Sequence, residues 1–176
     1  MPRGRKLRAK PLEPPLRVVL VEPEIPPNTG SIARTCAATG SALHLVGELG
    51  FRIDEQAVRR AGLDYWPLVD LHRHESLGEF AAEQPAARWH LLASGAERSI
   101  FDAPIEAGDA LIFGKESVGL DPALLDAHPD RVFGIPTMGP VRSLNLSNAV
   151  AITVYAALKK LGALNETYLA DDAVGH

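Results

Sequence analysis

Three segments of the sequence combine glycine and proline with polar side chains in a way that could support chemistry. They are PPNTGSIAR at residues 26–34, LIFGKESVGL at residues 111–120 and IPTMGPVRSLNLSN at residues 135–148. Glycine lets a ligand approach the backbone closely, and a loop of this kind offers backbone N–H groups to that ligand. If each segment follows a strand of an open α/β sheet, all three lie at the carboxyl edge, where such sheets bind their ligands.

The third segment carries the strongest functional signal. It places more polar side chains before a helix than helix capping requires: Arg142, Ser143, Asn145, Ser147 and Asn148. The first two segments also have ordinary structural interpretations when taken singly. Arg34 could be a surface residue of a helix capped by Asn28 or Thr29, and Glu116 could cap a helix or accept hydrogen bonds from loop amides.

Common nucleotide, hydrolase and metal motifs are missing. The sequence has no G-x-G-x-x-G, and a phosphate loop is excluded because Glu116 stands where Ser or Thr must hold magnesium. No serine has the G-x-S-x-G context of a hydrolase nucleophile. The single Cys36 excludes an internal disulfide and favours a small core residue. His72 and His74 are interpreted as solvated surface residues, so no metal site is predicted.

The elements that must position the three segments alternate between strand and helix. Apolar runs predict strands at residues 16–21, 42–46, 67–71, 89–93, 109–113 and 131–135. Helices are predicted at residues 28–39, 54–61, 77–82, 122–127 and 145–161. This alternation indicates an α/β fold with a mainly parallel sheet and helices on both faces. The last helix is apolar all round, which predicts burial on all sides and, in so small a chain, contact with a second subunit.

Length and charge divide the chain into one domain with two extensions. The 176 residues carry a net charge of −4, but residues 1–17 hold six cations against Glu13 alone. We therefore expect a basic, proline-rich disordered arm at residues 1–15, a single domain at 16–162 and a tail at 163–176. No apolar run is long enough to span a membrane, and no signal peptide is evident, so the cytoplasm is the expected location.

Together, the three segments resemble the three motifs of the SPOUT superfamily of RNA methyltransferases. The matching patterns are N-T-G-x-x-x-R, F-G-x-E-x-x-G-L and R-S-L-N-L-S-N-A-V, within a resemblance from Arg17 to about Leu161. EPEIPPNTG at residues 22–30 and RRAGLDY at residues 59–65 are similar to the small enzymes that methylate the ribose 2′-oxygen of the wobble cytidine or uridine of tRNA. Lys115, where that branch commonly has proline, and the long N-terminal arm depart from the pattern.

The resemblance implies a deep C-terminal trefoil knot, S-adenosylmethionine as methyl donor and a homodimer paired through the knot region and the last helix. The implied cofactor-binding residues are Leu91, Gly114, Glu116, Ile135, Met138, Ser143 and Leu144. The implied catalytic residues are Arg34, Ser143 and Asn145, where the arginine would hold the phosphate beside the target ribose. The implied RNA-binding residues are Asn28, Arg34, Arg59, Arg60, Lys115 and Arg142. No metal is implied.

The expected function is methylation of the ribose 2′-hydroxyl of the wobble nucleotide in the tRNA anticodon stem-loop. A 2′-O-methyltransferase for ribosomal RNA or another tRNA position is an alternative, as is a non-catalytic RNA-binding or assembly protein on the same scaffold. The basic arm is expected to contact RNA phosphates without sequence preference.

Overall fold

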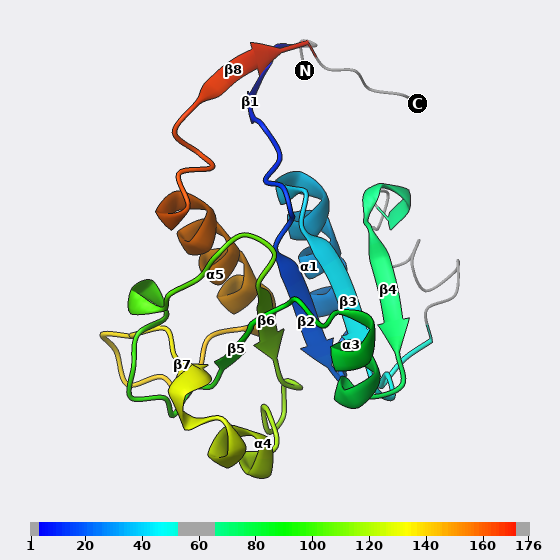
Figure 1. Cartoon of the computed structure of the whole chain (residues 1–176), viewed down its shortest axis with the longest axis vertical. Helices are drawn as coiled ribbons and strands as arrows, with labels where there is room; N and C mark the ends of the chain where they lie inside the picture. The colour runs from blue at the N-terminus through cyan, green and yellow to red at the C-terminus, as the bar shows by residue number, and fades with distance from the viewer. Residues whose placement is uncertain (1–3, 53–65, 172–176) are drawn as a thin grey trace.

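The computed structural model describes residues 4–52 and 66–171, and its centre is a six-stranded parallel sheet (Figure 1). The strands are β2 (Arg17–Val21), β3 (Ala42–Val46), β4 (Leu71–His74), β5 (Trp89–Leu92), β6 (Ala110–Phe113) and β7 (Val132–Phe133). Their order across the sheet is β4-β3-β2-β6-β5-β7, and every neighbouring pair is parallel. The predicted α/β class with a parallel sheet is confirmed.

Helices cover both faces of this sheet, as predicted. The longer helices are α1 (Pro26–Thr39) and α5 (Leu146–Lys160), which contact each other and pack on one face through residues such as Ile32 and Val154. The opposite face holds α3 (Leu77–Glu83) and α4 (Pro122–Ala127), and its core includes the fully buried Phe80. Short 3₁₀ turns span Trp66–Leu68, Ile100–Asp102 and Pro129–Arg131.

Most predicted elements occur, and the weakest prediction is wrong. The strand predicted at 67–71 is instead a 3₁₀ turn followed by β4, because Pro67 has no N–H to donate to a sheet. The strand predicted at 131–135 is reduced to the two residues of β7. The helix predicted at 54–61 lies outside the described residues.

Helix α1 begins earlier than predicted. Pro26 and Pro27 occupy its first two positions, where a missing N–H costs nothing, and Ile25 is the N-cap without a side-chain hydrogen bond of its own. Asn28 and Thr29, the predicted caps, are buried inside the first turn. Gly40 ends the helix in the left-handed conformation at φ 66°, as predicted.

Helix α5 is buried on one face in the single chain, and the contact of its other face with a second subunit stays a prediction. Val150, Val154 and Leu158 pack in the core, whereas Ile152 and Tyr155 remain 37% and 47% exposed. Asn145 caps the helix by accepting a hydrogen bond from the Ser147 N–H at 2.9 Å. Leu161 follows the helix as its C-cap, and Gly162 then turns the chain at φ 73°.

Both ends of the chain contribute to a second, two-stranded sheet, which we call the terminal ribbon. It consists of β1 (Lys6–Ala9) and β8 (Thr167–Ala170), paired antiparallel at the top of Figure 1. The expectation of a disordered arm at 1–15 is therefore wrong for β1, since pairing with β8 satisfies its backbone. Leu12 also packs against the core, so part of this segment belongs to the folded body.

A buried histidine cluster joins β3 to β4. The Nδ1 atom of His44 lies 2.9 Å from the Nε2 atom of His74, and the rings of His44 and His72 stack with centroids 4.6 Å apart. His44 and His74 are 1% and 4% exposed, so the surface interpretation of His74 is wrong. Along β4 the side chains of residues 72 and 74 share a face, and α3 covers that face with Phe80.

Within the described residues, no helix is long and apolar enough to cross a membrane. The same part of the chain holds no cluster of three or more His, Cys, Asp or Glu side chains that could bind a metal ion. The trefoil knot implied by the resemblance stays a prediction.

Candidate functional site

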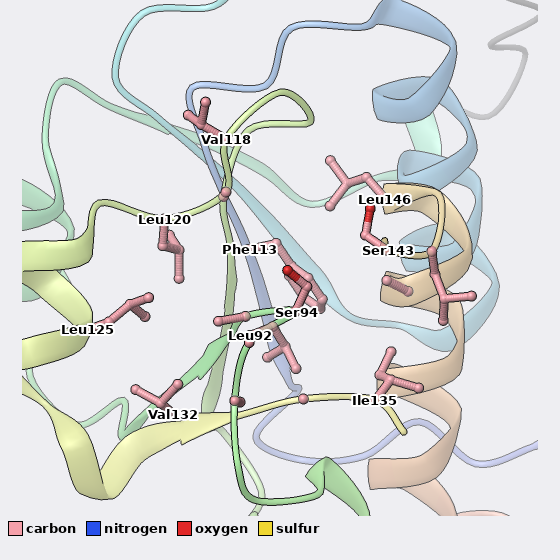
Figure 2. Close-up of a pocket in the computed structure, with 18 of the residues that line it drawn as sticks. Leu92, Ser94, Phe113, Val118, Leu120, Leu125, Val132, Ile135, Ser143 and Leu146 are labelled. Atoms are coloured by element: carbon pink, nitrogen blue, oxygen red, sulfur yellow. The ribbon is translucent and has the colours of Figure 1, made fainter. Parts of the chain in front are cut away.

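A cavity of about 1050 Å³ lies at the carboxyl ends of β5, β6 and β7. Parts of all three polar segments line it, together with residues 94–98 after β5. Figure 2 shows the start of α5 on one side of the cavity, with Ser143 and Leu146, and Leu125 of α4 on the other. The sequence thus places its three segments at one edge of the sheet, as the strand-and-helix alternation predicts.

The walls of the cavity combine apolar and polar side chains in similar measure. Apolar side chains from several elements point into it (Figure 2): Leu92, Phe113, Leu120, Leu125, Val132, Ile135 and Leu146. Charged side chains also line it: Glu97, Arg98, Lys115, Glu116, Asp126 and Arg142. A cavity that joins apolar walls to polar groups can hold a small organic ligand that has both apolar and charged parts.

Glu116 fixes the loop after β6 to the start of α1. Its Oε2 atom accepts a hydrogen bond from the Glu24 N–H at 2.8 Å, and its Oε1 atom accepts one from the Ile25 N–H at 3.1 Å. Oε1 also accepts from Asn28 Nδ2 at 3.3 Å. The carboxylate therefore holds the two backbone N–H groups that directly precede α1, and its negative charge lies at the positive end of the helix dipole.

Asn28 extends this network to the start of α5. Its Oδ1 atom accepts a hydrogen bond from Asn145 Nδ2 at 3.1 Å. Asn145 Oδ1 in turn accepts from Ser147, from the backbone N–H at 2.9 Å and from the hydroxyl at 2.5 Å. Residues from all three sequence segments are consequently held in one chain of hydrogen bonds, which fixes the relative positions of the two long helices at the cavity.

Gly114 is required by a close backbone approach. A Cβ atom at this position would lie 2.0 Å from the carbonyl carbon of Gly119 and 2.2 Å from the nitrogen of Leu120. The loop folds back here, with the Gly119 N–H donating to the Lys115 carbonyl at 2.8 Å and φ at Gly119 of 74°. No side chain at residue 114 is compatible with this turn, because both obstacles are backbone atoms.

Two acidic residues before α1 hold the outer part of the same loop. Glu24 Oε1 accepts from the Ser117 N–H at 3.1 Å and from the Ser117 hydroxyl at 2.6 Å, and these hydrogen bonds lower the pKa of Glu24. Glu22 Oε2 lies 3.5 Å from Lys115 Nζ. Across the cavity, Arg142 donates to the Ser117 carbonyl at 3.1 Å. Loop 114–120 is therefore fixed on both sides.

The structure brings together most of the site residues that the sequence implies. Those lining the cavity are Asn28, Gly114, Lys115, Glu116, Ile135, Arg142, Ser143, Leu144 and Asn145. Leu91 does not line it, because its side chain is buried on the sheet face covered by α3 and α4, and the next residue, Leu92, reaches the cavity. Met138 is fully exposed outside it.

Arg34 is placed on the exposed surface of α1 and does not line the cavity. Asn28, on the same helix six residues earlier, does line it. Arg59 and Arg60 lie outside the described residues. The roles of these residues stay predictions.

Sequence reasoning missed residues 94–98, which include the cavity residues Ser94 and Arg98. The available signal was their position directly after the buried strand β5, beside β6 and its glycine loop. It also missed Glu24, whose partner Ser117 is 93 residues away. No local pattern shows a contact of that separation.

Comparison with known proteins gives the family. The profile of the SpoU rRNA methylase family matches residues 15–155. A tRNA (cytidine(34)-2′-O)-methyltransferase of Burkholderia pseudomallei is 45% identical over 148 residues, which cover 82% of this chain and 95% of that protein. A solved structure concerned with the 2-OH methylation of C/U34 on tRNA is 44% identical, with a TM-score of 0.77 over 82% of this chain and 95% of that one.

A more distant structure concerns the cofactor. The SpoU methyltransferase AviRb of Streptomyces viridochromogenes, solved in complex with AdoMet, is 27% identical with a TM-score of 0.67, covering 87% of this chain and 58% of that one. The family match extends over most of the chain and includes all three segments around the cavity, so the SPOUT resemblance of the sequence is confirmed. This chain belongs to the SpoU methylase family.

Proposed function

We propose that this protein transfers a methyl group from S-adenosylmethionine to the ribose 2′-hydroxyl of nucleotide 34, a cytidine or uridine, in the anticodon stem-loop of tRNA. The observation that carries the proposal is the joining of the three family segments around one cavity by the hydrogen bonds of Glu116, Asn28 and Asn145. Relatives of 42–45% identity over more than four-fifths of the chain act, by name, at cytidine 34 of tRNA.

The cavity suits S-adenosylmethionine in size and in lining. Its volume of about 1050 Å³ lies just above the ~300–1,000 Å³ usual for small-molecule sites, so it has room for the whole cofactor. The apolar walls would hold the adenine ring, and the backbones of loops 94–98 and 114–120 would donate to its polar atoms. A Cβ atom placed at Gly95 or Gly119 would have no other residue's atom within 4 Å, so the space beside the backbone is open and a ligand can reach these loops.

When bound, S-adenosylmethionine supplies an electrophilic methyl group and leaves as S-adenosylhomocysteine. The chain's own residues must hold the ribose in line with that methyl group, because alignment provides a large part of the rate gain in such a displacement. Ser143 and Asn145 line the cavity at the start of α5, where they would orient the 2′-hydroxyl. The neighbouring Arg142 and Lys115 would contact RNA phosphates at the rim.

Arg34 would hold the phosphate next to the target ribose and stabilise negative charge on its oxygen. A guanidinium does not lose its proton in a protein, so its contribution is its positive charge and its hydrogen bonds rather than proton removal. Because Arg34 is exposed on α1 outside the cavity, it can reach RNA that lies across the protein surface.

The active form would be a homodimer in the cytoplasm, paired through α5 and the preceding loop. Exposed apolar side chains gather there: Met138, Val141, Ile152 and Tyr155. A solution mass near 38 kDa, twice the 18.9 kDa of one chain, is expected from light scattering. A mass of one chain at micromolar concentration would contradict this assembly.

Methylation of total tRNA with labelled cofactor tests the proposed function. The expected product carries the label on the ribose of nucleotide 34. Incorporation into ribosomal RNA or at another tRNA position would instead support the other 2′-O-methyltransferase alternatives. A calorimetric titration with S-adenosylmethionine separates an enzyme from a non-catalytic RNA-binding protein, which has no need to bind the cofactor.

A further inference from the structure

We propose that the terminal ribbon is a second RNA-binding element, which holds the phosphate backbone of the substrate through one face of the ribbon. This inference rests on the proposed function, because it takes an RNA substrate as given. It assigns a role to a part of the chain that lies beyond the family match at residues 15–155.

The ribbon concentrates positive charge in an otherwise acidic protein. Residues 5–10 contain four cations and no acid: Arg5, Lys6, Arg8 and Lys10. In the sequence, the opposite strand is flanked by three acids, Glu166, Asp171 and Asp172, and the pair between Arg5 and Asp171 at 3.5 Å is highly exposed and therefore weak. Residues 1–17 carry a net charge of +5, whereas the whole chain carries −4. The rest of the chain is therefore strongly negative and repels phosphate.

The strand register sorts the ribbon side chains into two different faces. Arg8 pairs with Tyr168 and Lys6 with Ala170, so these residues share one face. The other face carries the pair formed by Leu7 and Leu169. Two cations beside an exposed aromatic ring form a surface suited to nucleic acid, whose phosphates and bases it can contact.

The ribbon is also exposed to solvent and has little stability of its own. Leu7, Tyr168 and Leu169 are 68%, 54% and 61% exposed, and an isolated two-stranded sheet is only marginally stable in water. Figure 1 shows it projecting from the body, away from the six-stranded sheet. A bound partner would stabilise it, and the charge of β1 identifies a polyanion as that partner.

Within one chain, the ribbon and the cavity lie at opposite ends of α5 (Figure 1). The helix starts beside the cavity and its 15 residues extend about 22 Å toward the ribbon. The ribbon can therefore contact RNA at a distance from the reacting nucleotide. Such a contact strengthens RNA binding without changing the reaction of bound RNA, so it acts on the KM for tRNA and not on kcat.

The test compares Arg8→Gln with the matched control Arg73→Gln. Arg8 and Arg73 are both exposed and are both the third residue of a four-residue strand, β1 and β4 respectively. Arg73 serves as the control because β4 is the edge strand of the main sheet and does not belong to the ribbon. We expect Arg8→Gln, and more strongly the double variant Lys6→Gln/Arg8→Gln, to raise the Kd for tRNA in fluorescence anisotropy. The double variant should raise it about fivefold at low salt. It should also reduce the slope of log Kd against log salt by about 1.5, while Arg73→Gln leaves both unchanged.

Two further measurements keep the outcomes separate. The variant Leu7→Thr/Leu169→Thr alters the apolar face and keeps the cations, so it should retain tRNA affinity. If that variant loses affinity or changes the oligomeric mass while Lys6→Gln/Arg8→Gln does neither, the ribbon binds protein through its leucine face and the proposal is wrong. An unchanged Kd and salt slope in the double variant also overturns it. If wild-type protein binds tRNA in this way but never methylates it, the proposed function fails and the ribbon proposal stands.

Discussion

At the scale of single residues, the shape of the site depends on Glu116 and Gly114, which other residue types cannot replace. Glu116 was implied as a cofactor residue by resemblance, yet both its oxygens accept hydrogen bonds from the start of α1 and from Asn28. Backbone atoms of Gly119 and Leu120 occupy the space that a side chain at residue 114 would need. Both residues line the cavity, so they shape the site whether or not they touch the cofactor.

Gly114→Ala is expected to weaken S-adenosylmethionine binding at least tenfold. The new Cβ would meet Gly119 at 2.0 Å, and relief of that overlap must displace loop 114–120 from the cavity. Isothermal titration calorimetry measures the change. Gly139→Ala is the control, since a Cβ there meets nothing within 4 Å. Equal affinity of Gly114→Ala and wild type would show that this loop does not shape the binding site.

Glu116→Gln is expected to lower the free energy of unfolding by about 1–3 kcal/mol. The amide carries no charge for the α1 dipole, and its NH₂ group cannot accept from the backbone N–H groups of Glu24 and Ile25. Urea denaturation provides the measurement. Asp126→Asn changes an exposed carboxylate of the same cavity and should stay within about 0.5 kcal/mol. A Glu116→Gln variant as stable as this control would refute the role assigned to Glu116.

Arg34→Lys is expected to reduce kcat by about 10²–10³ while cofactor affinity is retained. Lysine keeps the charge but loses the planar, two-pronged donor geometry that suits phosphate. Arg34 lies outside the cavity, so its replacement should leave S-adenosylmethionine binding intact. Single-turnover methylation and calorimetry measure the two quantities. Near-normal turnover would exclude Arg34 from catalysis.

At the scale of elements, the sequence predicts what local patterning controls. The bounds of β3 and α4 match their predictions, because each is a continuous run with a clear start and end, such as Asp121 before Pro122. The start of α1 was misplaced because Pro26 and Pro27 are its first two residues, and the backbone before them is held by Glu116, about ninety residues away in sequence. The terminal ribbon was missed for the same reason: each of its strands has four residues and gains its structure only from a partner at the other end of the chain.

The buried histidine cluster between β3 and β4 predicts lower stability in acid. Burial, followed by the nearby His72, His74 and Arg17, lowers the pKa of His44 to about 3. In the unfolded chain its pKa is near ~6.5, so below that pH the unfolded chain binds a proton that the folded chain does not. The free energy of unfolding should therefore fall by about 2 kcal/mol from pH 7 to pH 5 through this residue.

Denaturation curves of wild type and His44→Gln across this pH range isolate the contribution of His44. The slope of the free energy of unfolding against pH should be smaller in the variant, by the amount that corresponds to the uptake of about one proton on unfolding. Because burial also lowers the pKa of His90, some acid sensitivity of the same sign should remain in the variant. Identical slopes for the two proteins would contradict the assignment to His44.

At the scale of the whole molecule, charge distribution matters more than total charge. A net charge of −4 gives no indication of an RNA partner, but residues 5–10 carry four cations, and Lys115 and Arg142 are among the residues that line the cavity. Family resemblance supplied the knot, which no local pattern predicts because it depends on how the complete chain is threaded. The apolar pattern of the last helix and the family resemblance both predict the dimer. The exposed Ile152 and Tyr155 on α5 are consistent with the proposed pairing.

The central claim is methylation of the ribose of nucleotide 34, and mapping of the modified nucleotide tests it most directly. Purified protein is incubated with unmodified tRNA and labelled S-adenosylmethionine, and the product is digested and analysed by mass spectrometry. We predict one 2′-O-methyl group on cytidine or uridine 34. A modified nucleotide outside the anticodon loop, or no transfer to tRNA by a protein that binds the cofactor, would contradict the claim.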